Sequence, residues 1–105
     1  MILYQNNLTL PAIRLNPDSA DIYYNLSNAH MLLGDVKNAI LAYKKALDIN
    51  SNDADITLNL AIAYYHAGEH KLAISYGDKA VKLGAKVHPE FLEIIEALKS
   101  VKQEN

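Results

Sequence analysis

The sequence contains no cysteine among its 105 residues. This absence excludes disulfide bonds and metal sites built on thiolates, and it removes the usual indicator of redox compartment. Glycine and proline are also scarce, with four and three residues. Three of the glycines, Gly34, Gly68 and Gly84, stand just after helical patterns and are predicted to end helices there.

The chain also lacks an excess of charge of one sign. Ten basic residues face twelve acidic ones, and the formal net charge is −2. A nucleic-acid-binding domain would carry a clear basic excess, so we expect no nucleic-acid partner. No apolar run approaches the roughly 20 residues of a membrane-spanning helix, and the apolar residues 1–4 lack the basic start of a signal peptide. We therefore expect a soluble, cytoplasmic protein without a membrane partner.

What the sequence does contain is an internal repeat, because residues 20–53 recur as residues 54–87. Aligned at a shift of 34 without gaps, the two segments are identical at 12 positions, where unrelated segments would share roughly two. A fixed period near 34 with two helical patterns per unit is typical of a helical repeat array. At this length, the array is expected to be one small domain.

Local signals divide each repeat into two helices. Helices are predicted at about 20–33, 36–49, 54–67 and 70–83, with a fifth at about 89–102. Asp18 or Ser19, then Asp35 and Asp53, are suited to cap the first three. Small residues should allow the helices of a pair to approach closely, and larger ones should fill the next interface. The small set is Ser27, Ala39, Ala46, Ala61, Ala73 and Ala80, and the large set is Tyr43, Leu47 and Ile49.

These motifs resemble the tetratricopeptide repeat family. The first unit has its aromatic, small, Gly-acidic and alanine positions in register over 23–50, and the second keeps Leu60-Ala61, Tyr64, Gly68-Glu69 and two alanines. Thr57 and Gly77 depart from the pattern, because large aromatics are usual there. The resemblance implies an all-α superhelix forming one domain over 1–105. Its parts would be an N-terminal partial unit (1–17), two full units (20–53 and 54–87) and a C-terminal capping helix (88–102).

In this family the first helix of each pair lines a concave groove that holds a peptide or a partner helix. The resemblance therefore implies the following partner-binding residues: Asp21, Tyr24, Asn25, Asn28, Asp55, Leu58, Asn59, Ile62 and Tyr65, with Leu32 and His66 beside them. Asn28 and Asn59 match the asparagines of the carboxylate clamp of chaperone-binding members, but Tyr24 and Asp55 stand where its basic residues would be. The partner is expected to be neutral or basic. Asn25 and Asn59 could equally bridge helices between repeats.

The function expected from this pattern is a non-enzymatic protein-interaction module with no cofactor and no metal. No serine, histidine and carboxylate stand at a recognisable catalytic spacing. Residues 48–52 resemble the start of a calcium loop, but Asp53 and Asn59 occupy the positions that require glycine and glutamate. Two alternatives stay open: a unit that assembles with its own copies, and a regulatory accessory subunit of a larger complex.

Two further expectations concern the ends of the array. Phe91 of the fifth helix should fill the space left by Gly77, with Tyr76 beside it. The N-terminal segment is apolar but broken by Pro11, so it can offer only a short helix to cover the first repeat. Either it folds back over Ile22, Tyr23 and Leu26, or two copies exchange these segments in a homodimer, which the pattern favours.

Overall fold

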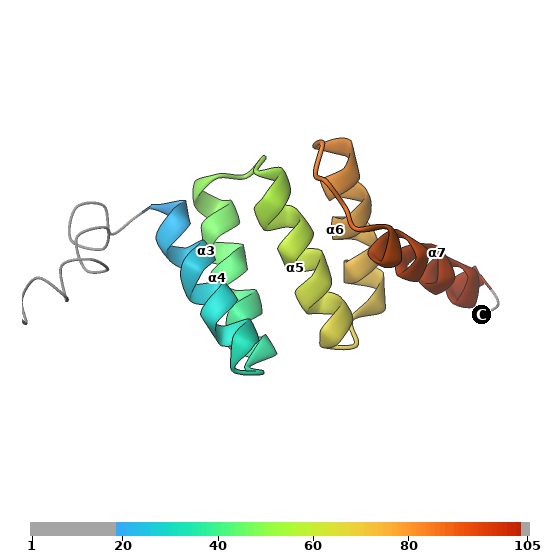
Figure 1. Ribbon diagram of the computed structural model, residues 1–105, viewed down its shortest axis with the longest axis horizontal. Helices are drawn as coiled ribbons and strands as arrows, with labels where there is room; N and C mark the ends of the chain where they lie inside the picture. The colour runs from blue at the N-terminus through green and yellow to red at the C-terminus, as the bar shows by residue number, and fades with distance from the viewer. Residues whose placement is uncertain (1–18, 104–105) are drawn as a thin grey trace, which may run out of the picture.

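A computed structural model describes residues 19–103, which form five α-helices and no strand (Figure 1). The helices are α3 (Ala20–Leu32), α4 (Val36–Ile49), α5 (Ala54–His66), α6 (His70–Lys82) and α7 (Pro89–Gln103). Every end lies within one residue of the position predicted from the sequence. The prediction of an all-α helical repeat is confirmed. The expected partial unit at 1–17 lies outside the described residues.

Short-range hydrogen bonds explain where the helices begin. The backbone N–H of Asp21 donates to Ser19 Oγ at 3.1 Å, and that of Ile56 donates to Asp53 Oδ1 at 2.9 Å. Asp35 accepts from the backbone of Asn38 at 3.4 Å in the same way. These side chains satisfy N–H groups that have no partner within the helix. Of the two residues predicted to cap α3, Ser19 is therefore the one that does so.

The helices pack in chain order, as Figure 1 shows, with α3 against α4, α4 against α5, α5 against α6 and α6 against α7. Fully buried small residues occur where the helices approach, including Ser27, Ala39, Ala46, Ala61, Ala73 and Ala80. Ser27 Oγ donates to the carbonyl of Tyr23 at 2.6 Å, and Thr57 Oγ1 to that of Asp53 at 2.7 Å. The two polar side chains in the core are thereby satisfied, as burial requires.

Larger side chains form one core that runs between the repeats. Tyr43 and Leu60 are almost fully buried, and Leu47 packs partly buried against them. Ile49, predicted to join them, is 45 % exposed, so that prediction is wrong. Ile49 is the last residue of α4 and stands beside the first residues of α3. The described part of the chain provides no further helix to cover it there.

The outer side of α3 is less covered than the same side of α5. Leu60 is fully buried, whereas its repeat equivalent Leu26 is 46 % exposed; Ala63 is buried, whereas its equivalent Ala29 is exposed. The reason is position, because α4 packs on this side of α5. No helix precedes α3 among residues 19–103. Within residues 19–103, an apolar face of the first repeat is therefore uncovered.

At the other end, α7 closes the array around Gly77. A β-carbon built on Gly77 would lie 3.2 Å from Ile95 Cδ1 and 3.8 Å from Phe91 Cε2. Phe91 thus contributes to this space as expected, but Ile95 is nearer. The ring of Tyr76, the residue before Gly77, packs on that of Tyr64, with centroids 5.5 Å apart. Within residues 19–103, no helix is long and apolar enough to cross a membrane.

Candidate functional site

Residues from both repeats surround a hollow between α3 and α5. Four of the nine partner-binding residues that the family resemblance implied line it: Tyr24 and Asn28 from α3, and Asn59 and Ile62 from α5. Leu32, expected beside them, lines it as well. We call this space, of about 420 Å³, the α3–α5 hollow. Its other lining residues are Met31 and Tyr43. The wall therefore combines three aliphatic side chains with two phenols and two amides.

Asn59 links the two repeats. Its Nδ2 donates to the carbonyl of Asp55 at 2.9 Å and to the hydroxyl of Tyr24, across in the first repeat, at 3.1 Å. A carbonyl oxygen can only accept, so the bond to Asp55 fixes which way the amide faces. Both N–H groups of Asn59 are then used inside the protein. Its Oδ1 is left to accept a hydrogen bond from another molecule.

The amide of Asn28 is bonded inside the protein through its oxygen, whereas that of Asn59 is bonded through its nitrogen. The hydroxyl of Tyr43, which is only 2 % exposed, donates to Asn28 Oδ1 at 2.6 Å. Burial, with a smaller contribution from nearby Tyr24, raises the pKa of Tyr43 to about 12. The phenol therefore stays protonated at neutral pH and remains a donor. The amide N–H groups of Asn28 have no hydrogen-bond partner among the described residues, so the two asparagines offer complementary groups.

The other predicted site residues do not line this hollow. Asp21, Asn25 and Asp55 are exposed on the first helices, and Leu58 is partly buried against the core. The ring of Tyr65 is directed elsewhere, with its centroid 6.3 Å from that of Phe91 and 6.4 Å from that of His70. Tyr65 therefore joins α5 to α6 and α7. His66 also lies at that end, with its ring 5.3 Å from that of Tyr65.

Two lining residues were missed by the sequence reasoning. Met31 is the repeat equivalent of Tyr65, so assigning Tyr65 to the groove should have assigned Met31 as well. Tyr43 belongs to a second helix, and its equivalent is Gly77. Because the second repeat has no aromatic residue at this position, the sequence did not indicate that the Tyr43 hydroxyl contacts Asn28 of the first helix.

Charge is divided between the two kinds of helix. The first helices α3, α5 and α7 carry five carboxylates and two lysines, whereas the second helices α4 and α6 carry six lysines and two carboxylates. No lysine or arginine is among the residues that line the α3–α5 hollow. A carboxylate clamp needs cations beside its asparagines, and this site has none.

Several carboxylates and histidines of the described residues have structural contacts. Asp53, next to the segment that resembles a calcium loop, accepts from Asn50 Nδ2 at 3.3 Å and caps α5. Tyr65 has ring contacts with both His66 and His70. No group of three or more metal-ligating side chains occurs within 19–103.

Comparison with known families gives two overlapping matches. Residues 28–68 match a family model described as TPR repeat, and residues 50–87 match one described as Tetratricopeptide repeat. Together they extend from the middle of α3 to the end of the second repeat. A search among curated proteins finds no match to the chain.

Proposed function

The chain belongs to the tetratricopeptide repeat family, and on that basis we propose that it is a non-enzymatic interaction module that binds a segment of a partner protein in the α3–α5 hollow. Repeats of this family generally mediate contacts between proteins. The partner segment lies across α3 and α5, where both repeats contribute to the wall.

The observation that carries this proposal is the fixed orientation of two amides. Asn28 offers N–H groups and Asn59 offers a carbonyl oxygen, because Tyr43 and Asp55 occupy their other ends. A peptide backbone has one acceptor and one donor per residue, so it can satisfy both amides without any particular side chain. Amides held in place before binding lose little freedom on binding, which favours affinity.

The surrounding residues define the partner further. Met31, Leu32 and Ile62 line the hollow and suit an apolar side chain of the ligand. Asp21 and Asp55 are exposed on the same two helices, and they favour lysine or arginine next to that side chain. A segment rich in aspartate or glutamate would be repelled. The proposed ligand is therefore an apolar segment of neutral or basic character.

The test begins with a pull-down that uses the whole chain as bait and identifies the partner by mass spectrometry. Affinity is then measured for the double variant Asn28→Ala/Asn59→Ala, which removes both outward-facing amides. We expect binding to weaken by about 1–3 kcal/mol, the range for lost or orphaned hydrogen bonds.

A matched control separates binding from internal support. Tyr43→Phe removes the same bond to Asn28 but keeps both amides. It should lower the melting temperature and, because Asn28 is then no longer held in place, weaken binding by less than the double variant does. If Tyr43→Phe weakens binding as much as the double variant does, the amides act only as internal supports and the groove assignment is wrong.

A second candidate function, self-association, is favoured by the bare face of α3. Leu26 and Ala29 are exposed there, although their equivalents in the second repeat are buried. A second copy packed on this face would bury them around a two-fold axis. Light scattering over a range of concentrations tests this. Leu26→Glu should yield a monomer, whereas Leu41→Glu, at another exposed leucine, should leave the dimer intact. If the unmodified chain is a monomer at every concentration, self-association is excluded.

A further inference from the structure

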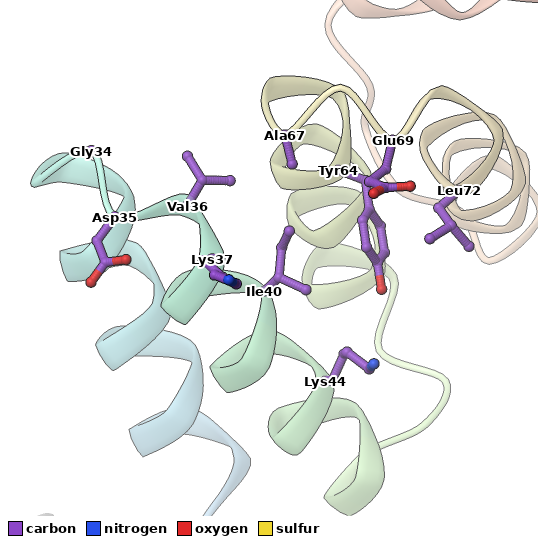
Figure 2. A pocket seen from close by; sticks show the side chains of 10 residues that line it. All are labelled: Gly34, Asp35, Val36, Lys37, Ile40, Lys44, Tyr64, Ala67, Glu69 and Leu72. Atoms are coloured by element: carbon purple, nitrogen blue, oxygen red, sulfur yellow. The ribbon is translucent and has the colours of Figure 1, made fainter.

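The α3–α5 hollow is accompanied by a larger one on another part of the protein. A space of about 710 Å³ lies between α4 and α6, and we call it the α4–α6 hollow. Figure 2 shows Ile40 of α4 facing Tyr64 across the hollow, with Leu72 beyond Tyr64. Val36 of α4 also lines the hollow. The remaining lining residues are Gly34, Asp35, Lys37, Lys44, Ala67 and Glu69. Both repeats contribute to it, so it exists only because they stack.

This hollow faces away from the α3–α5 hollow. An α-helix turns by about 100° per residue. Tyr64 therefore lies about 140° around α5 from Asn59 and about 160° from Ile62, which line the other site. A ligand in one hollow does not occupy the other. The chain thus has two separate concave surfaces.

Two cations flank the apolar part of the α4–α6 hollow. Lys37 and Lys44 are exposed and seven residues apart, about 10 Å along the helix axis, and Ile40 lies between them. Neither ammonium has an ion-pair partner within residues 19–103. They belong to the lysine-rich second helices, so the field on this side of the protein attracts anions.

The two carboxylates of the hollow differ in what they contact. Asp35 accepts hydrogen bonds from Asn38, and its Oδ2 lies 3.5 Å from His30 Nδ1. Glu69 starts α6 without a side-chain capping bond, and in Figure 2 its carboxylate lies beside Tyr64 and Leu72. An incoming anion would avoid this wall. Glu69 therefore directs negative groups toward Lys37 and Lys44 on α4.

We propose that the α4–α6 hollow is a second docking surface, which accepts a protein segment with a large apolar side chain flanked by carboxylates. The apolar side chain packs on Ile40, Leu72 and the ring of Tyr64. The carboxylates pair with Lys37 and Lys44. The charge of this ligand is opposite to that expected for the α3–α5 hollow, so one chain can hold two different partner segments at once.

A random twelve-residue peptide library displayed on phage provides the probe. Peptides selected on the unmodified chain are synthesised, and their dissociation constants are measured by fluorescence anisotropy against variants. Lys37→Glu/Lys44→Glu should weaken one class of peptides by at least about tenfold, since two ion pairs become two repulsions. We expect that class to carry a leucine, isoleucine or aromatic residue flanked by aspartate or glutamate. Glu69→Gln should strengthen the same peptides, because it removes a like charge.

Two control variants keep the result specific. Lys79→Glu/Lys86→Glu makes the same change in net charge at lysines outside the hollow and should leave these affinities nearly unchanged. Asn28→Ala/Asn59→Ala alters only the other site and should also leave them unchanged. Melting curves check that each variant is folded.

Three results would overturn the proposal. One is a selection in which no peptide depends on Lys37 and Lys44. Another is a dependent class that is rich in lysine and arginine. The third is self-association of the chain that disappears in Lys37→Glu/Lys44→Glu, because the hollow would then be occupied by a second copy.

Discussion

At the scale of single residues, the hydroxyl of Tyr43 joins stability to the candidate site. Its pKa is about 12 in the folded chain, chiefly because it is buried, and an unfolded tyrosine titrates near 10. A folded pKa above the unfolded value means that the fold favours the neutral phenol. This contribution is complete below about pH 10 and is lost as the pH rises through about 12.

The first prediction follows from the raised pKa of Tyr43 in the folded chain. Between pH 9 and pH 12, the free energy of unfolding should fall by roughly 2–3 kcal/mol on account of Tyr43. Urea unfolding at several pH values measures the fall. Lysines also lose their charge in this window, so the comparison is with Tyr43→Phe, which should lose less stability over the same range. Equal slopes for the two proteins would contradict the assignment.

The second prediction concerns Gly77. Phenylalanine at this position would overlap Ile95 and Phe91, so Gly77→Phe should lower the free energy of unfolding by about 1–3 kcal/mol. Alanine would gain about 1 kcal/mol of helix propensity, but its β-carbon meets Ile95 Cδ1 at 3.2 Å. Gly77→Ala should therefore change stability by less than about 1 kcal/mol.

A double-mutant cycle checks the cause. Ile95→Val removes Cδ1, so Gly77→Ala should become stabilising in that background, as expected for two residues in contact. Denaturant unfolding of the four proteins gives the coupling. A Gly77→Phe variant that melts above the parent would show that the space is larger than the contacts indicate.

At the scale of helices, α7 is attached to α6 by apolar and ionic contacts. Phe91 and Ile95 are buried, and Lys99 Nζ lies 3.0 Å from Asp78 Oδ1. The hydrogen bond to Asp78, followed by that to Glu96, raises the pKa of Lys99. Exposed pairs of this kind contribute little to stability. Burial of the two apolar side chains therefore accounts for most of the attachment.

The third prediction compares equivalent leucines of α3 and α5. Leu60→Ala should lower the free energy of unfolding by about 2–5 kcal/mol, because it leaves a cavity under α4. Leu26→Ala should lower it by no more than about 1 kcal/mol, because the side chain is already 46 % exposed. Chemical denaturation of both variants decides this. Equal losses would mean that the α3 face is covered in solution.

At the scale of the whole molecule, charge divides the protein into two sides. Carboxylates predominate on α3, α5 and α7, and lysines predominate on α4 and α6. The net charge of −2 conceals this separation. We propose that it gives the two hollows opposite preferences, and we expect binding at each of them to be sensitive to salt.

The fourth prediction concerns residues 1–10, which lie outside the described residues. If two copies exchange their N-terminal segments, the intact chain should be a dimer by sedimentation, and deleting 1–10 should yield a monomer. If the segment instead caps its own chain, the intact protein should be a monomer at every concentration, with a lower melting temperature after the deletion. The second outcome would contradict the dimer.

The sequence by itself determined the helices and their order. Asp35 and Asp53 cap backbone N–H groups only three residues away. Gly34 and Gly68 end helices with φ of 79°, a conformation that favours glycine. Interactions over three or four residues are readable from local patterns. The 34-residue period then implied stacking, because a single helix pair cannot cover its own apolar face.

The tertiary structure decided which side chains meet. The bonds from Tyr43 to Asn28 and from Asn59 to Tyr24 join residues 15 and 35 positions apart, and they connect each amide to another helix. Ile95, rather than Phe91, lies nearest Gly77 because of how α7 sits on α6. Such contacts depend on the rotation and spacing of neighbouring helices, which the packing of the entire core sets. For the same reason the α4–α6 hollow, which draws on three helices and the turns beside them, had no signature in the sequence.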